Sequence, residues 1–131
     1  MKKTVILFSL LVFTFGCSKK ANLTIGKKLD KKNLVVSDIT KVFTAKDNVS
    51  FVLFNNKKFE TTKLILQIYK FTEKSAEEMK RNYILDINPE SDKIANSIPA
   101  NKLKRLYGKG EFKFVFILKE KVIASGKFAI E

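Results

Sequence analysis

The chain has 131 residues and a formal net charge of +13, because Lys and Arg outnumber Asp and Glu by 26 to 13. It contains no His and a single Cys, which excludes His-dependent catalytic triads and an intramolecular disulfide. The length suits one small domain whose stability comes from apolar packing.

The first 16 residues have the pattern of an export signal. Lys2 and Lys3 are followed by an uncharged apolar run, Val5 to Phe15, and then by Gly16. A positive start, an apolar run and a small residue are typical of a secretory signal. The run is shorter than the roughly 20 apolar residues that span a bilayer. The pattern therefore predicts a signal peptide over residues 1–16 rather than a transmembrane helix.

The only Cys follows this run directly, in the order Thr14-Phe15-Gly16-Cys17. The segment resembles the lipobox of bacterial lipoproteins, in which Gly or Ala precedes a lipid-bearing Cys. Thr14 and Phe15 stand where Leu and a small residue are usual, as in the relaxed boxes of spirochaetal-type lipoproteins. The resemblance implies cleavage between Gly16 and Cys17, and a diacylglyceryl group with an N-acyl chain on Cys17. We favour this interpretation over an incidental free thiol, which is unusual in an exported protein.

Residues 17–32 are polar and basic, with few apolar side chains. Their lysines are Lys19, Lys20, Lys27, Lys28, Lys31 and Lys32. This composition predicts a tether between the lipid and the folded domain. Lysines close to an anionic bilayer would add about 1 kcal/mol each to membrane binding.

From residue 33 onward, short apolar runs alternate with polar turns. Candidate strands lie at 34–36, 39–43, 49–54 and 63–71, and a turn-prone stretch occupies 55–58. Several short strands separated by turns are typical of an all-β sandwich.

The segment after residue 74 predicts a short helix. Ser75 and Glu78 have the spacing of a capping box, in which each side chain bonds the other residue's backbone N–H. We therefore expect a helix over about 76–82, inserted between strands, followed by a strand at 83–87. Residues 94–98 are ambiguous, and Pro99 prevents a continuing helix.

The C-terminal residues predict a long hairpin. Phe112, Phe114, Phe116 and Leu118 alternate on one strand and share one face. Two registers are open, because the loop can contain two residues (119–120) or three (119–121). The three-residue loop pairs the four apolar residues with Phe128, Gly126, Ala124 and Val122, respectively. We favour it, because a slip of one residue would move the apolar set to the wrong face.

Gly108-Lys109-Gly110-Glu111-Phe112 and the hairpin that follows resemble the closing strands of immunoglobulin-like or fibronectin-like domains. The disulfide and core Trp of antibody domains are absent. Residues 33–131 are thus expected to form a small, mainly β, antiparallel immunoglobulin-like sandwich with one short helix.

The sequence offers little for catalysis. Asp86, Glu90 and Asp92 surround a turn, but their spacing is unlike that of a calcium loop. Glu77 and Glu78 are better explained by helix capping and the helix dipole. We expect no enzyme, no metal site and no cofactor besides the lipid on Cys17. An enzyme that uses the acidic cluster is the weakest alternative.

The densest basic cluster comprises Lys102, Lys104, Arg105, Lys109 and Lys113, with Leu103, Leu106 and Tyr107 interleaved. The cluster either binds a polyanion, with Tyr107 as a flat contact, or forms a solvated face while Leu103 and Leu106 point inward. We favour the solvated face, because charge runs usually mark exposed surface.

Together these features predict a lipid-anchored envelope protein that acts as a non-enzymatic binding or structural module. Its expected partners are a membrane, through the lipid, and an anionic polymer or protein of the envelope or host. Neither nucleic acid nor a small-molecule substrate is expected. Ser18 after Cys17, rather than the Asp that retains many lipoproteins in the inner membrane, favours the outer membrane. The alternative function is a surface adhesin that binds polyanions through the basic cluster.

Overall fold

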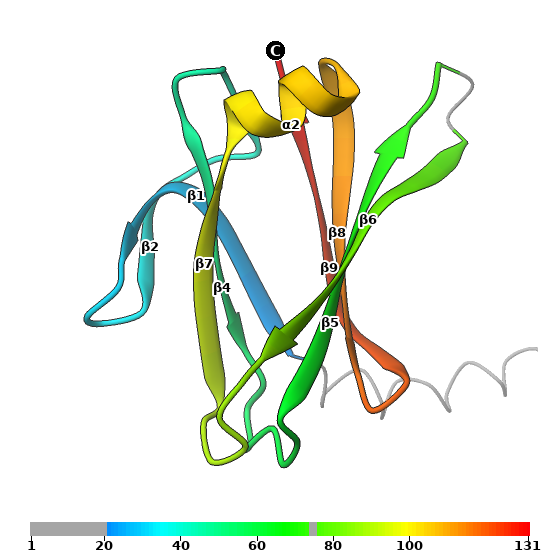
Figure 1. Cartoon of the computed structure of the whole chain (residues 1–131). Coiled ribbons are helices and arrows are strands. Elements are labelled where there is room, and N and C mark those ends of the chain that lie inside the picture. Colours follow the sequence, from blue (N-terminus) through cyan, green and yellow to red (C-terminus); the bar gives the residue numbers. More distant parts are fainter. Residues whose placement is uncertain (1–20, 74–75) are drawn as a thin grey trace, which may run out of the picture.

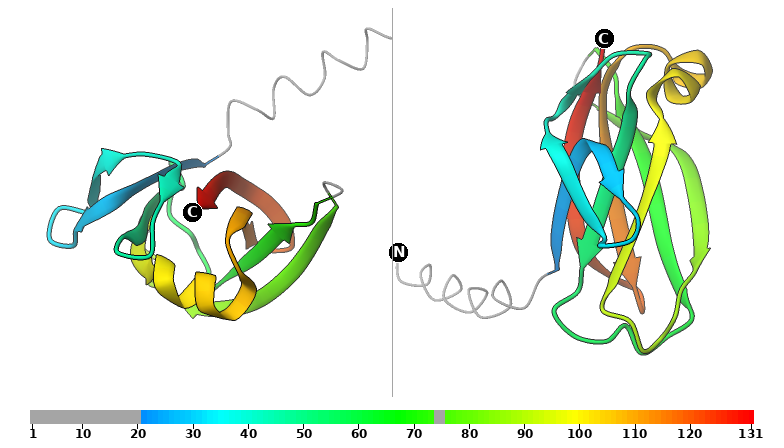
Figure 2. Two further views of the ribbon diagram at one scale, coloured as in Figure 1. Left: turned by 90° about the horizontal axis from the view of Figure 1, so that it is seen from above. Right: turned by 90° about the vertical axis from the view of Figure 1, so that its left-hand side faces the viewer.

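The computed structural model describes residues 21–73 and 76–131, and it confirms the mainly β sandwich (Figure 1). One sheet has the order β2-β1-β4-β7, and the other has the order β3-β9-β8-β5-β6. The first contains β1 (Asn22–Asp30), β2 (Val35–Ile39), β4 (Asn48–Phe54) and β7 (Lys93–Pro99). The second contains β3 (Val42–Phe43), β5 (Lys63–Phe71), β6 (Glu77–Asp86), β8 (Gly110–Leu118) and β9 (Lys121–Ile130). Helix α2 (Ala100–Tyr107) covers one end (Figure 2).

Phenylalanine rings from both sheets form the centre of the core. Phe51 on β4 lies 5.5 Å from Phe114 and 5.2 Å from Phe116, measured between ring centroids. Phe114 also lies 4.7 Å from Phe128 on β9. All four side chains are at most 2% exposed. The alternation of large apolar residues in β8 therefore places one row of rings against the opposite sheet.

The predicted hairpin register is confirmed over most of its length and wrong at the loop. Phe112 pairs with Phe128, Phe114 with Gly126 and Phe116 with Ala124, as expected. The loop, however, contains the two residues Lys119 and Glu120, both with positive φ. A bulge after Phe116 shifts the register, so that Val122 pairs with Ile117 and not with Leu118. The bulge lets a tight turn and an apolar inner face coexist.

The predicted helix at 76–82 is wrong, because Glu77–Asp86 forms β6, which pairs with β5 along its whole length. The strand is the edge of its sheet and is charged over its first half, so it lacks the alternation that marks a half-buried strand. Pairing with β5 outweighs the local capping signal of Glu78. Ser75, the other half of that signal, lies outside the described residues.

The predicted boundary between tether and domain is also wrong, because residues 22–30 form β1 between β2 and β4. Ile25 is 6% exposed and belongs to the core. Gly26 allows β2 to approach, because a Cβ at this position would lie 2.6 Å from Val36 Cγ1 and 2.8 Å from the Ser37 carbonyl oxygen. The sandwich thus begins before residue 33. The predicted signal peptide and Cys17 lie outside the described ranges.

The ambiguous segment 94–98 belongs to β7, and α2 follows directly after Pro99. The helix is held by Ala100 and Leu103, which are 0% and 1% exposed. The Ala100 N–H donates to the Asp47 carbonyl oxygen at 3.0 Å.

Within 21–73 and 76–131, no helix is long and apolar enough to cross a membrane.

Asp47 makes the structure beside α2 sensitive to acid. The N–H of Thr44, which donates to the carboxylate at 2.8 Å, and then Lys27 lower the pKa of Asp47 below its usual 3.8. A depressed pKa in the folded state stabilises the protein above the unfolded pKa, and the contribution is lost as pH falls through the folded value. Asp47→Asn is therefore expected to be less stable than wild type at pH 7, with the difference shrinking below about pH 4. Urea unfolding across pH checks this, and a constant difference would contradict it.

Candidate functional site

Two opposite ends of the sandwich carry different features. At one end, where the described chain begins, the Ala21 N–H donates to the Ile123 carbonyl oxygen at 3.3 Å, beside the β8–β9 turn. At the other end lies α2, which leads through Gly108 into the start of β8 (Figure 1). β8 contains nine residues, which corresponds to about 26 Å at the strand rise of about 3.3 Å per residue. Helix α2 and the point where the N-terminal segment joins are thus separated by the length of a strand.

Helix α2 carries three of the five predicted basic residues. Lys102 and Arg105 are exposed, and Lys104 is half-buried. In the described part of the chain, none of the three has a carboxylate within 4.0 Å. Leu103 faces the core as expected, but Leu106 is 55% exposed and lies one helical turn from Lys102. The helix therefore presents uncompensated positive charge around an exposed Leu.

Lys109 extends this basic surface past the end of the helix. It stands between Gly108 and Gly110, which have φ angles of 87° and 138°. Lys70 on β5 lies against the same loop, since a Cβ at Gly110 would be 3.3 Å from Lys70 Cε. The sequence does not place Lys70 in the basic cluster, because only the pairing of β5 with β8 brings it here.

Lys113, the fifth residue of the predicted cluster, lies elsewhere. It is on β8, and its Nζ lies 2.6 Å from Glu77 on β6 and 5.4 Å from the ring centroid of Tyr69. Its side chain is only 20% exposed. The structure therefore brings together Lys102, Lys104, Arg105 and Lys109, hereafter the basic end, and separates Lys113 from them.

Arg81 on β6 adds a cation that is distant in sequence from the predicted cluster. Its guanidinium lies 5.0 Å from the centroid of the Tyr83 ring. The hydrogen bond with Tyr83, and to a smaller degree the nearby Tyr107, raise the pKa of Arg81 above its ordinary value. Because Tyr107 is the last residue of α2, Arg81 lies toward the basic end and is permanently charged.

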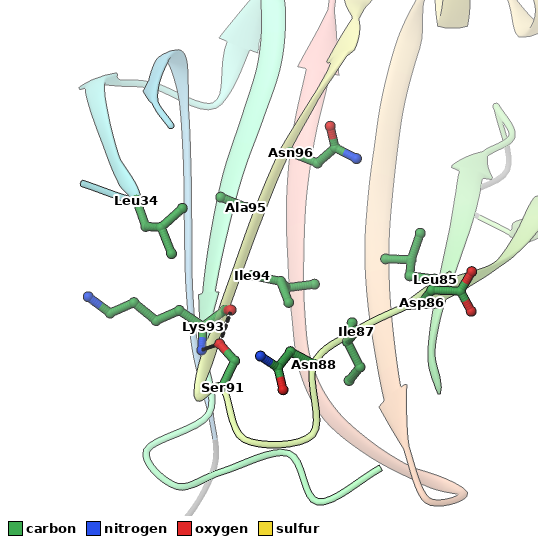
Figure 3. A pocket seen from close by; sticks show the side chains of 10 residues that line it. All are labelled: Leu34, Leu85, Asp86, Ile87, Asn88, Ser91, Lys93, Ile94, Ala95 and Asn96. Carbon is green, nitrogen blue, oxygen red and sulfur yellow. Dashed lines mark hydrogen bonds between the residues drawn. The ribbon is translucent and has the colours of Figure 1, made fainter. Parts of the chain in front are cut away.

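A cleft opens between β6 and β7, which are the edge strands of different sheets (Figure 3). Its volume is about 330 Å³, and Leu85, Ile87 and Ile94 supply its apolar lining. Ser91 Oγ accepts from the Lys93 N–H at 3.2 Å and donates to the Lys93 carbonyl oxygen at 2.9 Å. On the same strand, Asn96 Oδ1 accepts from the Ser97 N–H at 2.8 Å. These polar groups bond one another rather than converge on a ligand.

Two of the three acidic residues near this cleft are in ion pairs with different lysines. Asp86 pairs with Lys63, and Glu90 pairs with Lys58 at 2.8 Å. Across 21–73 and 76–131, no three His, Cys, Asp or Glu side chains are placed to hold a metal ion. The arrangement gives no support to the alternative that Asp86, Glu90 and Asp92 form a catalytic cluster.

Comparison with known proteins identifies the fold. The chain is similar to an immunoglobulin-like protein of Pseudomonas aeruginosa, PA1606, with a TM-score of 0.58, 14% identity, and coverage of 84% of this chain and 92% of that chain. It is also similar to the PmoD soluble domain from Methylocystis, with a TM-score of 0.52, 9% identity, and coverage of 85% and 90%. No family model and no curated protein matches the sequence. The predicted immunoglobulin-like sandwich is thus confirmed, while identities this low carry no information about function.

Proposed function

We propose that this protein is a lipid-anchored envelope module, tethered through Cys17, that presents its basic end to an anionic partner. The observation that carries the proposal is that the start of β1 and helix α2 lie at opposite ends of the sandwich (Figure 2). A lipid on Cys17 would hold the Ala21 end near the membrane and direct α2 away from it. The lipobox resemblance and the separated acidic residues agree with a binding role rather than an enzymatic one.

Distance and screening determine what the basic end can bind. Only residues 18–20 separate Cys17 from Ala21, so the link reaches at most about 15 Å at 3.8 Å per Cα step. The Debye length is about 8 Å at physiological ionic strength, shorter than the strand length of about 26 Å that separates the two ends of the sandwich. When the domain stands on its tether, charges on the anchoring membrane are screened from α2. The basic end is then free to bind another anionic surface.

The chemistry of the basic end fits a flexible polyanion, such as a sulfated or phosphorylated polysaccharide. Its four cations lie on one helix and the loop that follows, and none has a carboxylate partner in the described chain. Arg pairs well with phosphate and sulfate, because its planar donors match the oxygens of these groups. Tyr107 and Leu106 offer adjacent contacts for a sugar ring or an acyl chain.

The proposal is tested with heparin as the probe and the lipidated protein in phosphatidylcholine vesicles. The variant K102Q/K104Q/R105Q/K109Q removes the four cations and keeps good helix formers. At about 1 kcal/mol for each cation, heparin affinity is expected to fall by about 10² to 10³-fold. The salt dependence of binding is expected to become shallower.

A matched control removes the same charge at another place. Lys28, Lys31, Lys32 and Lys57 are exposed, lie outside α2, and have no ion pair among the described residues. Their replacement by Gln is expected to reduce heparin affinity much less. If both variants lose affinity equally, binding depends on net charge and the basic end is not the site.

A further inference from the structure

The outer face of the five-stranded sheet carries a row of aliphatic side chains, one from each of four adjacent strands. The row consists of Ile84, Ile65, Ile117 and Val122, from β6, β5, β8 and β9. Ile84 and Val122 are 64% and 58% exposed. Ile65 and Ile117, between them, are half-buried. An aliphatic row that is exposed at both ends is uncommon on a sheet face that contacts only water.

The next positions along the same face are mostly polar: Asn82, Gln67 and Ser125 are polar, and Val115 is apolar but only 8% exposed. Gln67 donates to Asn82 at 3.2 Å and accepts from the Tyr69 hydroxyl at 2.8 Å. Further toward α2, Lys113 pairs with Glu77. Met79, opposite Tyr69, is also 50% exposed on this face, so the row is the apolar part of the face that lies farthest from α2 and not the only one.

This row lies where the N-terminal segment meets the domain. Val122 directly precedes Ile123, whose carbonyl oxygen accepts the Ala21 N–H. The β8–β9 turn beside Val122 also carries two exposed lysines: Lys119, which pairs with Glu60 at 3.4 Å, and Lys121, which has no ion pair among the described residues. An aliphatic row bordered by lysines matches the boundary between acyl chains and headgroups, where apolar groups enter the chains and cations meet phosphate.

We propose that the row Ile84–Ile65–Ile117–Val122 rests on the bilayer that holds the lipid anchor, so that the domain tilts onto one end of its five-stranded sheet. This inference depends on the proposed anchor at Cys17. The link of three residues keeps the row beside the membrane, and the contact fixes an orientation that the anchor alone would leave open. The basic end still points away from the bilayer, because only the near end of the sheet makes contact.

The chain allows a clean labelling test. Cys17 is the single native cysteine, and once lipidated its sulfur cannot react with a maleimide. A cysteine introduced by Ile84→Cys or Val122→Cys is then the only thiol that takes a fluorophore. The labelled lipoprotein is placed in phosphatidylcholine vesicles that contain a lipid with a spin label near the headgroup. Asn101→Cys, on the exposed side of α2, is the matched control position.

We expect the spin-labelled lipid to quench fluorescence at positions 84 and 122 at least twofold more than at position 101. Equal quenching at all three positions overturns the membrane contact. Quenching at position 84 that occurs without spin-labelled lipid and increases with protein density also overturns the membrane contact, because a second copy of the chain then covers the row. Reaction of the wild-type chain with maleimide instead shows that Cys17 carries no lipid, and this outcome contradicts the anchor itself.

Discussion

Replacing Phe114 with Ala is expected to lower the free energy of unfolding by about 3–5 kcal/mol. The side chain is fully buried and contacts Phe51, Phe116 and Phe128 at centroid distances of 5.5, 6.3 and 4.7 Å. The substitution removes the transfer free energy of the ring and leaves a cavity between the two sheets. Since small domains have a total stability of about 5–15 kcal/mol, the loss is a large part of the whole.

Urea unfolding of the two proteins measures this difference directly. Phe71→Ala is the matched control, because Phe71 is half-buried near the sheet edge and its ring lies 4.8 Å from Lys127 Nζ. The control is expected to lose clearly less stability than Phe114→Ala. Equal losses would show that the ring cluster between the sheets does not dominate the stability of the domain.

Cys17→Ser is expected to abolish lipid attachment completely. A Ser hydroxyl does not form the thioether that holds the diacylglyceryl group, and without this group the precursor is expected to keep residues 1–16. The energetic effect is large, because each acyl CH₂ in the bilayer contributes about 0.8 kcal/mol and stable anchoring needs more than one chain. Labelling of cells with radioactive palmitate, followed by isolation of the protein, measures the attachment.

The matched control for this variant changes the neighbouring positions and keeps the cysteine. Thr14→Leu with Phe15→Ala brings the segment closer to the usual lipobox, so palmitate incorporation is expected to persist or increase. Palmitate on the Cys17→Ser protein would contradict lipidation at this residue. Absence of label from both the wild type and the control would contradict the lipobox interpretation as a whole.

The elements that the sequence predicted well are those with one buried face. The Phe row of β8 specified its partner residues on β9, because any other register exposes several rings. The second half of β6 was predicted as a strand at 83–87, but its first half was missed, because it is charged and exposed and Glu78 looked like part of a helix cap. β1 was missed because lysines surround its few apolar residues, and Ile25 alone reaches deep into the core.

The candidate site was predictable where its residues are close in sequence. Lys102, Lys104, Arg105 and Lys109 form a dense run, and α2 with its following loop keeps them at one end. Lys70 and Arg81 lie on other strands, and no spacing in the sequence indicates that they are near the basic end. Lys113 was misassigned, because its pairing with Glu77 depends on β6 being a strand.

The mass of the mature protein tests most directly whether the domain is anchored through a lipid on Cys17. The protein isolated from membranes is expected to begin at Cys17 and to carry the added mass of a diacylglyceryl group and an acyl chain on that residue. A mature chain that begins at another residue, or that begins at an unmodified Cys17, would contradict the anchor and the orientation derived from it.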